Sequence, residues 1–198
     1  MKSHFFAFLR RMKFIRRWGL MRNTMPENIQ EHSLEVAWIA HHLAILKNTY
    51  FGGQVDVNQA AVIAMYHEVS EIFTGDLPTP IKYFDQSIRK VYGDIELAAQ
   101  RKLLDTLPLE VQPAYEPYLI EPEKSDLWKL VKAADTMAAF FHCVAEKQAG
   151  NSEFNEAYTS TLEKLKKYEM PEVNLFLELY VDSLNLSLDQ LNYTVTKE

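Results

Sequence analysis

The sequence contains very little cysteine, because Cys143 is the only one among 198 residues. A single thiol cannot form a disulfide within the chain, so we expect a reducing, cytoplasmic setting and a buried, unreactive side chain. Long apolar runs are also missing: none approaches the roughly 18 residues that cross a bilayer, and the N-terminus has no signal-peptide core. These absences exclude a disulfide-stabilised scaffold and predict a protein that does not associate with membranes.

Strand patterns are missing as well. No segment alternates apolar and polar residues between hairpin turns, and there is no internal repeat, low-complexity tract or flexible linker. Hydrophobic residues make up 47% of the chain and charged residues 24%, as is usual for globular proteins, and 198 residues suffice for one sizeable core. The sequence therefore predicts an all-α fold, a helical bundle in a single domain over residues 1–198.

Acidic residues are absent from residues 1–22, which contain seven of the 21 basic residues and none of the 27 acidic ones. The rest of the chain is therefore strongly acidic, which argues against binding a nucleic-acid polymer. Three interpretations of the basic segment are open: an organelle transit segment, a solvated helix face, or a positive site for a small anionic ligand. Arg17 fits the third interpretation best, because Trp18 stands beside it.

Capping residues and breakers mark the expected helices. Asn28 followed by Glu31 predicts the start of a helix that runs to about residue 48. One stripe of this helix is expected to consist of Leu34, Ala37, Trp38 and His41. A second helix is expected from about residue 58 to Gly75, followed by an extended loop at Pro78 and Pro80. Further helices are expected over residues 87–106, 126–148, 153–167 and 171–189, with shorter ones before residue 18 and between residues 108 and 122.

The densest group of polar residues lies between His67 and Asp76. On a continuous helix the side chains of His67 and Glu68 diverge by about 100°, and both can still reach one ion between them. Glu71 follows His67 by one turn on the same face, and Asp76 follows Gly75, at which the chain can turn sharply. Imidazole and carboxylate groups bind divalent metal ions, so this stretch predicts part of a metal site.

Two isolated polar residues on other helices are candidates for the remaining ligands. His32 lies in the first turn of its helix, and Asp135 lies in an apolar run over residues 130–139. An ionised carboxylate in such a run is costly unless it is paired or bound to metal. Taken alone, His32 is better explained as a capping or core histidine, and Asp135 can be a buried acid paired with Lys132. Glu71 alone is equally a solvated helix residue, so the argument depends on their joint occurrence.

The motifs that occur together are Glu31-His32-Ser33, then His67-Glu68-x-x-Glu71-x-x-Thr74-Gly75-Asp76-Leu77-Pro78-Thr79-Pro80, and finally Lys132-Ala133-Ala134-Asp135. A further motif is Arg16-Arg17-Trp18 followed by Leu20-Met21-Arg22-Asn23. This set resembles the HD-domain phosphohydrolases, and within them the bacterial YfbR-type 5'-deoxynucleotidase family. The resemblance covers nearly the whole chain, from His4-Phe5-Phe6 to the last helices.

The resemblance implies an all-helical fold, a homodimer, and hydrolysis of deoxyribonucleoside 5'-monophosphates to deoxynucleoside and phosphate. It implies one divalent metal ion, such as Co, Mn, Zn or Mg, held by His32, His67, Glu68 and Asp135. It also implies substrate binding by Arg17, Trp18 and Thr79. Catalysis is assigned in the same way to Glu71 and Asp76.

One position departs from the family pattern, because an adjacent His-Asp pair is replaced by His67-Glu68. The additional methylene moves the carboxylate by about 1 Å, while sites of this kind are usually held within about 0.5 Å. Two alternatives therefore stay open: a nucleotide-binding relative with weak or lost turnover, and an HD-type enzyme for a cyclic nucleotide, a triphosphate or an alarmone. A zinc-protease motif is not supported, because Glu71 stands where its second histidine would be.

We hypothesise a metal-assisted hydrolysis of a phosphomonoester. The ion activates a water and polarises a phosphoryl oxygen, and Glu71 or Asp76 orients that water or transfers protons. Arg17 offers a guanidinium fork to the phosphate, and Trp18 packs against the sugar and excludes a 2'-hydroxyl by shape. No sequence pattern supports a role for His4, His41, His42 or His142.

Overall fold

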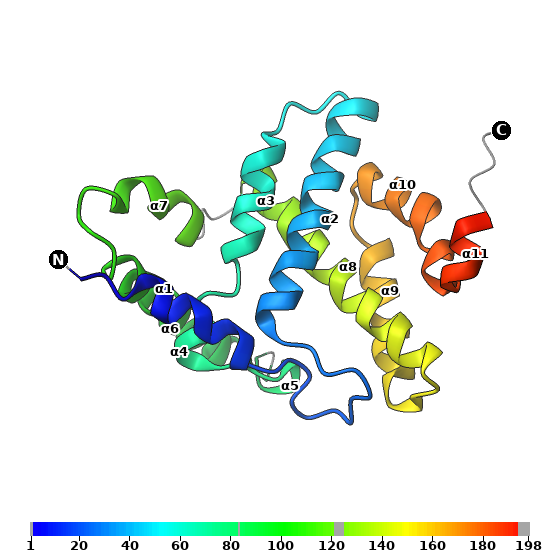
Figure 1. Cartoon of the computed structure of the whole chain (residues 1–198), viewed down its shortest axis with the longest axis horizontal. Helices are drawn as coiled ribbons and strands as arrows, with labels where there is room; N and C mark the ends of the chain where they lie inside the picture. The colour runs from blue at the N-terminus through cyan, green and yellow to red at the C-terminus, as the bar shows by residue number, and fades with distance from the viewer. Residues whose placement is uncertain (1, 83, 121–124, 194–198) are drawn as a thin grey trace.

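The computed structural model describes residues 2–82, 84–120 and 125–193 (Figure 1). Within these ranges every regular element is a helix, and β-type pairing is limited to one antiparallel bridge between Arg16 and Asn28. The all-α prediction is therefore confirmed. The elements are α1 Phe5–Leu9, η1 Arg10–Phe14, α2 Ile29–Tyr50, α3 Val57–Tyr66, α4 Glu71–Thr74, α5 Thr79–Lys82, α6 Gln86–Leu104, α7 Gln112–Leu119, α8 Asp126–Gln148, η2 Ser152–Phe154, α9 Asn155–Lys166, α10 Pro171–Tyr180, η3 Asp182–Asn185 and α11 Leu188–Tyr193.

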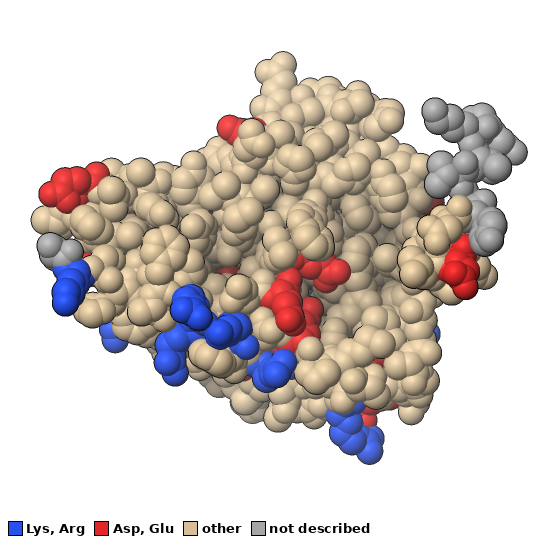
Figure 2. Space-filling view, in the orientation of Figure 1, with Lys and Arg blue, Asp and Glu red and all other residues tan. Residues whose placement is uncertain are grey.

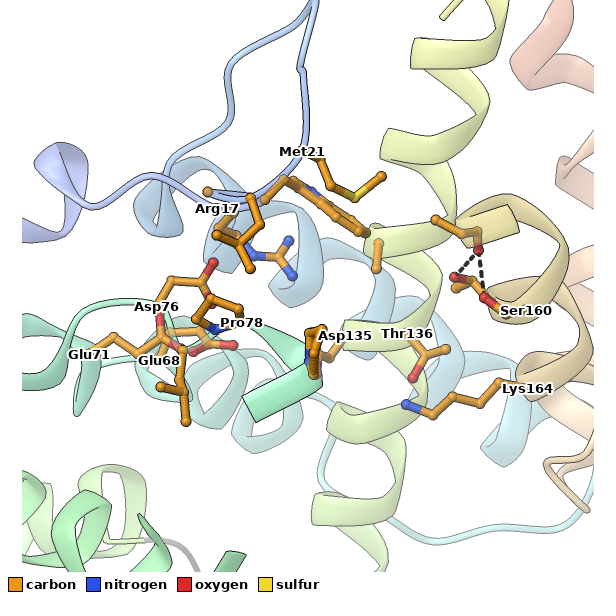
Figure 3. Close-up of a pocket in the computed structure, with 18 residues that line it drawn as sticks. Arg17, Met21, Glu68, Glu71, Asp76, Pro78, Asp135, Thr136, Ser160 and Lys164 are labelled. Atoms are coloured by element: carbon orange, nitrogen blue, oxygen red, sulfur yellow. Dashed lines mark hydrogen bonds between the residues drawn. The ribbon is translucent and has the colours of Figure 1, made fainter. Parts of the chain in front are cut away.

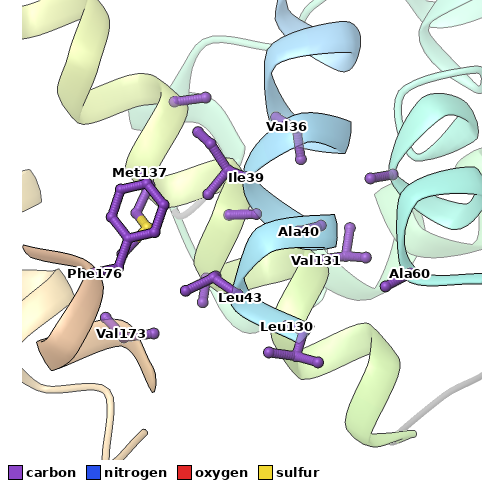
Figure 4. Packing of buried hydrophobic residues seen from close by; sticks show 14 of the residues in the cluster. Val36, Ile39, Ala40, Leu43, Ala60, Leu130, Val131, Met137, Val173 and Phe176 are labelled. Carbon is purple, nitrogen blue, oxygen red and sulfur yellow. The ribbon is translucent and has the colours of Figure 1, made fainter. Parts of the chain in front are cut away.

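The two long helices α2 and α8 pack against each other at the centre of the molecule (Figure 1). Helix α3 packs on both of them, α10 on α2, and α9 on α8. Alanines on the facing sides, such as Ala40 and Ala134, are fully buried and allow the helices to approach closely. The apolar cluster around this contact also contains Val36, Ile39, Leu43, Leu130, Val131, Met137, Val173 and Phe176 (Figure 4).

A second buried cluster joins the N-terminal segment to α6 and α7. It consists of Phe5, Met12, Ile29, Val69, Leu103, Leu104, Leu107 and Leu119. Because Phe5 and Met12 belong to this cluster, the basic segment is part of the fold, which does not suit a transit segment. Most of its basic side chains are exposed, among them Arg10, Arg11 and Lys13 on η1 and Arg16 just after it, and Figure 2 shows basic side chains gathered on one part of the surface.

The expected starts of the two central helices are confirmed by their caps. Asn28 Oδ1 accepts two backbone N–H groups of the first turn of α2, both at 3.0 Å, and Ser125 Oγ accepts one from α8 at 3.1 Å. The expected stripe of α2 is wrong, because Leu34 and Trp38 are 45% and 66% exposed. The buried face follows the helical period from Ile29 instead.

The helix expected to run to Gly75 is interrupted. Helix α3 ends at Tyr66, residues 67–70 form turns, and α4 begins at Glu71. In the interruption, backbone N–H groups donate to carbonyls three residues earlier, as from Glu71 to Glu68 at 3.0 Å, which tightens the chain. This turn sets the directions of the candidate ligands His67 and Glu68, which lie in it, and of Glu71, which follows it.

Two further sequence expectations are corrected. The helix expected over residues 171–189 is split into α10, η3 and α11. Near the break, Ser183 Oγ donates to the Tyr180 carbonyl at 2.7 Å, and this side-chain hydrogen bond competes with the backbone hydrogen bonds of a helix. The loop after Pro78 is helical over α5, because a proline such as Pro80 is tolerated in the first turn of a helix. None of the helices described in the structure is sufficiently long and apolar to span a membrane.

Candidate active site

Four candidate metal ligands come together from three parts of the chain. His32 lies in the first turn of α2, His67 and Glu68 in the turn after α3, and Asp135 in the middle of α8. One ligand atom from each lies within 4.8 Å of the others. His32 Nε2 is 3.0 Å from Asp135 Oδ1, and His67 Nε2 is 3.2 Å from Glu68 Oε1 and 3.9 Å from Asp135 Oδ1. Two imidazoles and two carboxylates suit divalent ions such as Zn, Mn or Co.

One buried atom tests whether this group fits a metal ion. His67 Nδ1 lies 2.7 Å from the Ala64 carbonyl, so Nδ1 carries the proton and donates it. His67 Nε2 then holds the free lone pair, and it has no hydrogen-bond partner among the described residues although the ring is fully buried. An unpaired buried nitrogen that faces two carboxylates fits a ligand position.

The cluster carries a net negative charge, because its carboxylates are ionised and the ring of His32 is neutral. Burial opposes ionisation of Glu68 and of Asp135, but the adjacent histidines hold the pKa of each carboxyl well below its usual range. Burial and the charge of Arg17 lower the pKa of His32, so its ring is neutral. Deprotonated carboxylates and neutral imidazoles are the forms that bind metal.

Glu71 and Asp76 lie beside the cluster. Glu71 begins α4 and is 5% exposed, and burial together with the charge of Glu68 raises the pKa of its carboxyl far above the usual value. The raised pKa favours a protonated Glu71 that can donate a proton. Gly75, at φ 74°, ends α4 in the left-handed region, and the chain turns there toward Asp76.

Arg17 and Trp18 are held at the site by a short closed loop. The Arg16–Asn28 bridge joins its ends, and Arg17 N–H donates to the Glu27 carbonyl at 3.0 Å. Trp18 has φ 59°, a left-handed conformation that costs on the order of 1–2 kcal/mol for a residue other than glycine. Its ring stacks on His142, with centroids 5.4 Å apart and planes at 12°. Strain of this kind persists where the surroundings compensate for it.

These residues surround a cavity of about 520 Å³, a usual size for a small-molecule site (Figure 3). One wall is the loop from Arg17 to Met21, and another is the segment with Glu68, Glu71 and Asp76. The remaining walls come from α8 and α9, with Asp135, Thr136, Ala139, Ala157, Ser160, Thr161 and Lys164. Two of the candidate metal ligands, Glu68 and Asp135, therefore face a cavity that is large enough for a nucleotide.

Sequence reasoning named most of these residues but not all. The side chain of Thr79 lies outside the described part of the structure, although Pro78 and Pro80 on either side line the cavity. Glu27, His142 and Lys164 were missed. His142 and Lys164 lie in ordinary helical patterns that give no local signal. Glu27 directly precedes the cap of α2, a position at which an acid is common.

Comparisons with known proteins find similar sequences over nearly the whole chain. The family model described as 5'-deoxynucleotidase YfbR-like matches residues 4–184. A 5'-deoxynucleotidase YfbR from Escherichia coli O127:H6 is 48% identical over 192 residues, which are 96% of each chain. The relative of the same name from Shigella boydii serotype 18 is 47% identical over the same shares.

Solved structures show the same fold. An HD-domain phosphohydrolase from Listeria innocua matches with a TM-score of 0.80 and 24% identity over 96% of this chain and 92% of that one. The Cyanophage S-2L HD phosphohydrolase, which was solved with dA and one catalytic Zn²⁺ ion, matches with a TM-score of 0.64 and 22% identity over 89% and 96%. At these identities the likeness shows the fold alone, and it confirms the predicted helical bundle.

Proposed function

This chain belongs to the YfbR-like 5'-deoxynucleotidase family, and we propose that it hydrolyses deoxyribonucleoside 5'-monophosphates to deoxynucleoside and phosphate with a divalent metal ion. The observation that carries the proposal is the four-ligand cluster at the wall of a nucleotide-sized cavity. Bound there, a divalent ion supplies a Lewis acid for the phosphoryl group and lowers the pKa of a coordinated water.

The residues around the cluster divide the remaining work. His32, His67, Glu68 and Asp135 hold the ion. Arg17 binds the phosphate through its guanidinium fork, and Trp18 packs against the sugar and excludes a 2'-hydroxyl. Glu71 and Asp76 orient the water and transfer protons, and a protonated Glu71 suits donation to the leaving sugar oxygen. Thr79 stays a predicted substrate contact.

Several finer points stay predictions. They are a single ion, its identity among Co, Mn, Zn and Mg, a homodimer, a cytoplasmic location and one HD-type domain over residues 1–198. The absence of binding to nucleic-acid polymers and to membranes is likewise a prediction. A single domain is supported by the contact of α2 with both buried clusters, since Ile29 belongs to one and Val36 to the other.

Phosphate release tests the proposed function. The metal-stripped protein is supplied with Co, Mn, Zn or Mg and assayed with the four deoxynucleoside monophosphates and with AMP, a cyclic nucleotide and dATP. We expect release from the deoxynucleoside monophosphates, little from AMP, and none from Asp135→Ala. Glu71→Ala should lose at least about 100-fold in kcat. If no metal supports release from any deoxynucleoside monophosphate, the proposal is wrong.

The same metal-loaded protein distinguishes an enzyme from a relative that binds nucleotides without hydrolysing them. A relative without turnover would bind dAMP in calorimetry without releasing phosphate. A rate of phosphate release that rises with metal loading excludes it.

A further inference from the structure

Glu27 is a buried charged residue that the proposed reaction does not use. It lies between the Arg17–Trp18 loop and α2, one residue before the Asn28 cap, and its side chain is 10% exposed. It is not among the residues that line the cavity. A buried carboxylate requires partners that compensate for lost hydration, so its contacts indicate what it serves.

The contacts of Glu27 reach both halves of the site. Its Oε2 accepts hydrogen bonds from Arg17 Nη1 at 2.8 Å and from Trp18 Nε1 at 3.1 Å. Its Oε1 lies 3.8 Å from His32 Nδ1. One carboxylate therefore binds Arg17 and Trp18 and lies next to the candidate metal ligand His32.

The contact with His32 matters because both ring nitrogens are constrained. A histidine that gives Nε2 to a metal carries its proton on Nδ1, and a carboxylate that accepts this N–H orients the ring. In this structure Arg17 Nη1 lies 2.5 Å from the same Nδ1, and because a guanidinium only donates, Nδ1 accepts there and Nε2–H faces Asp135 Oδ1 at 3.0 Å. When Nε2 instead binds a metal, the ring proton moves to Nδ1, and Glu27 Oε1, which is 3.8 Å away, has to approach by about 1 Å to accept it.

We propose that Glu27 is a positioning residue that links the metal ligand His32 to the phosphate-binding residue Arg17. Its Oε1 fixes the ring of His32 for metal binding, and its Oε2 directs Arg17 and Trp18 into the cavity. The role of Oε2 toward Arg17 and Trp18 rests on the proposed function. The role of Oε1 toward His32 concerns metal binding alone. Metal affinity and substrate affinity should therefore both depend on this one carboxylate.

The first test is Glu27→Gln, which keeps the shape but places an amide NH₂ where a carboxylate oxygen accepts. We expect the Kd for Mn²⁺, measured by calorimetry without nucleotide, to rise about 10–100-fold. The KM for dAMP at saturating Mn²⁺ should rise about tenfold, because the amide oxygen that still accepts from Arg17 and Trp18 is neutral and the bonds lose their charge assistance. Glu27→Asp keeps the charge and should recover part of both effects.

The matched control is Glu153→Gln. Glu153 pairs with Arg22 of the same loop at 2.5 Å, and within the described residues its side chain makes no hydrogen bond or ion pair with Arg17, Trp18 or His32. We expect this variant to keep the Mn²⁺ Kd and the KM within about twofold. A general weakening of the loop would instead change both variants alike, and would overturn the proposal.

A double variant separates the two halves of the linkage. In an Arg17→Ala background, Glu27→Gln should raise KM by a smaller factor, because the guanidinium is gone and only the bond from Trp18 remains. It should still weaken Mn²⁺ binding, because that effect passes through His32. If Glu27→Gln folds and binds Mn²⁺ as the unchanged protein does, the linkage is wrong. Failure of the nucleotidase proposal would show separately, as absent phosphate release with Mn²⁺ binding still sensitive to Glu27.

Discussion

Glu68 is the residue at which the chain departs from the adjacent His-Asp pair of the HD-domain phosphohydrolases. On a continuous helix, its additional methylene would move the carboxylate away from the ligand position. The turn over residues 67–70 replaces that helix, and Oε1 of Glu68 lies 3.2 Å from His67 Nε2. The backbone and the longer side chain are therefore compatible with a glutamate ligand, which zinc and similar ions accept.

Substitution of Glu68 tests whether this carboxylate is a ligand. Glu68→Ala removes one of the four candidate metal ligands. We expect the Kd for Mn²⁺ to rise at least about 100-fold and phosphate release to be lost. Glu68→Asp should keep the Kd within about tenfold, since the carboxylate remains. Calorimetric titration measures both. An alanine variant with unchanged affinity would exclude Glu68 from the ligand set.

Glu35 predicts a pH dependence of stability. Burial, with the charge of Glu27 added, raises the pKa of its carboxyl from 4.5 to about 7. A carboxyl with a raised pKa in the folded state favours the folded state fully below pH 4.5, and this contribution is lost as the pH rises through 7. A glutamine at position 35 does not ionise, so Glu35→Gln should not lose this contribution. The free energy of unfolding of the variant minus that of the unchanged protein should therefore increase by roughly 1 to 3 kcal/mol from pH 5 to pH 8.

Urea unfolding at the two pH values measures the Glu35 effect. The comparison of variant with unchanged protein cancels the pH response of other groups. A difference that stays constant from pH 5 to pH 8 would show that Glu35 ionises normally.

At the scale of elements, α8 supports the site twice. Asp135 in its middle is a candidate ligand, and Glu146 near its end holds the loop that carries Trp18. The Glu146 carboxylate accepts Thr24 N–H at 2.9 Å, Met25 N–H at 2.8 Å and Asn151 Nδ2 at 2.8 Å, and also the Thr24 hydroxyl. Burial opposes its ionisation, but these hydrogen bonds lower its pKa to about 2. Glu146 is therefore ionised at neutral pH.

We expect Glu146→Gln to loosen this loop, because an amide NH₂ cannot accept the backbone N–H groups. The KM for dAMP should rise about tenfold, and the Kd for Mn²⁺ should stay unchanged, since no ligand is displaced. In a Trp38→Phe, Trp128→Phe background, Trp18 fluorescence reports the loop through its stack on His142. Unchanged fluorescence and KM would contradict an anchoring role.

At the scale of the molecule, the ligand cluster links α2, the turn after α3, and α8. These segments surround the central core, so an ion bound by all of them connects elements that unfolding separates. A ligand that binds only the folded state stabilises it by mass action. Metal loading should therefore be visible as global stability, independently of turnover.

Metal addition should raise the melting temperature. At a free concentration 100 times Kd, the gain is about 2.7 kcal/mol, which corresponds to roughly 5–10 °C for a chain of this size. Thermal unfolding with and without Mn²⁺ or Zn²⁺ measures it, and a chelator should reverse it. Asp135→Ala should show little shift, and an equal shift in that variant would place the ion elsewhere.

The sequence by itself determined the helices with clear local signals and the types of residue at the site. Asn28 and Ser125 cap α2 and α8 through hydrogen bonds within one turn, so adjacent residues suffice to predict them. The long apolar run around Asp135 likewise marks a buried helix whatever packs against it. The turn after Tyr66 was not predicted. Its hydrogen bonds to carbonyls three residues earlier are close in energy to those of a continuous helix, so no local residue pattern marks it.

Only the tertiary structure decided how the site is assembled. His32 and Asp135 are 103 residues apart and meet because α2 and α8 pack through small side chains. The exposure of Trp38, the stack of Trp18 on His142 and the position of Glu27 between Arg17 and His32 likewise depend on helices distant in sequence. Periodicity reports that a face is buried, but its partner is chosen by packing across the whole chain, which no local pattern encodes.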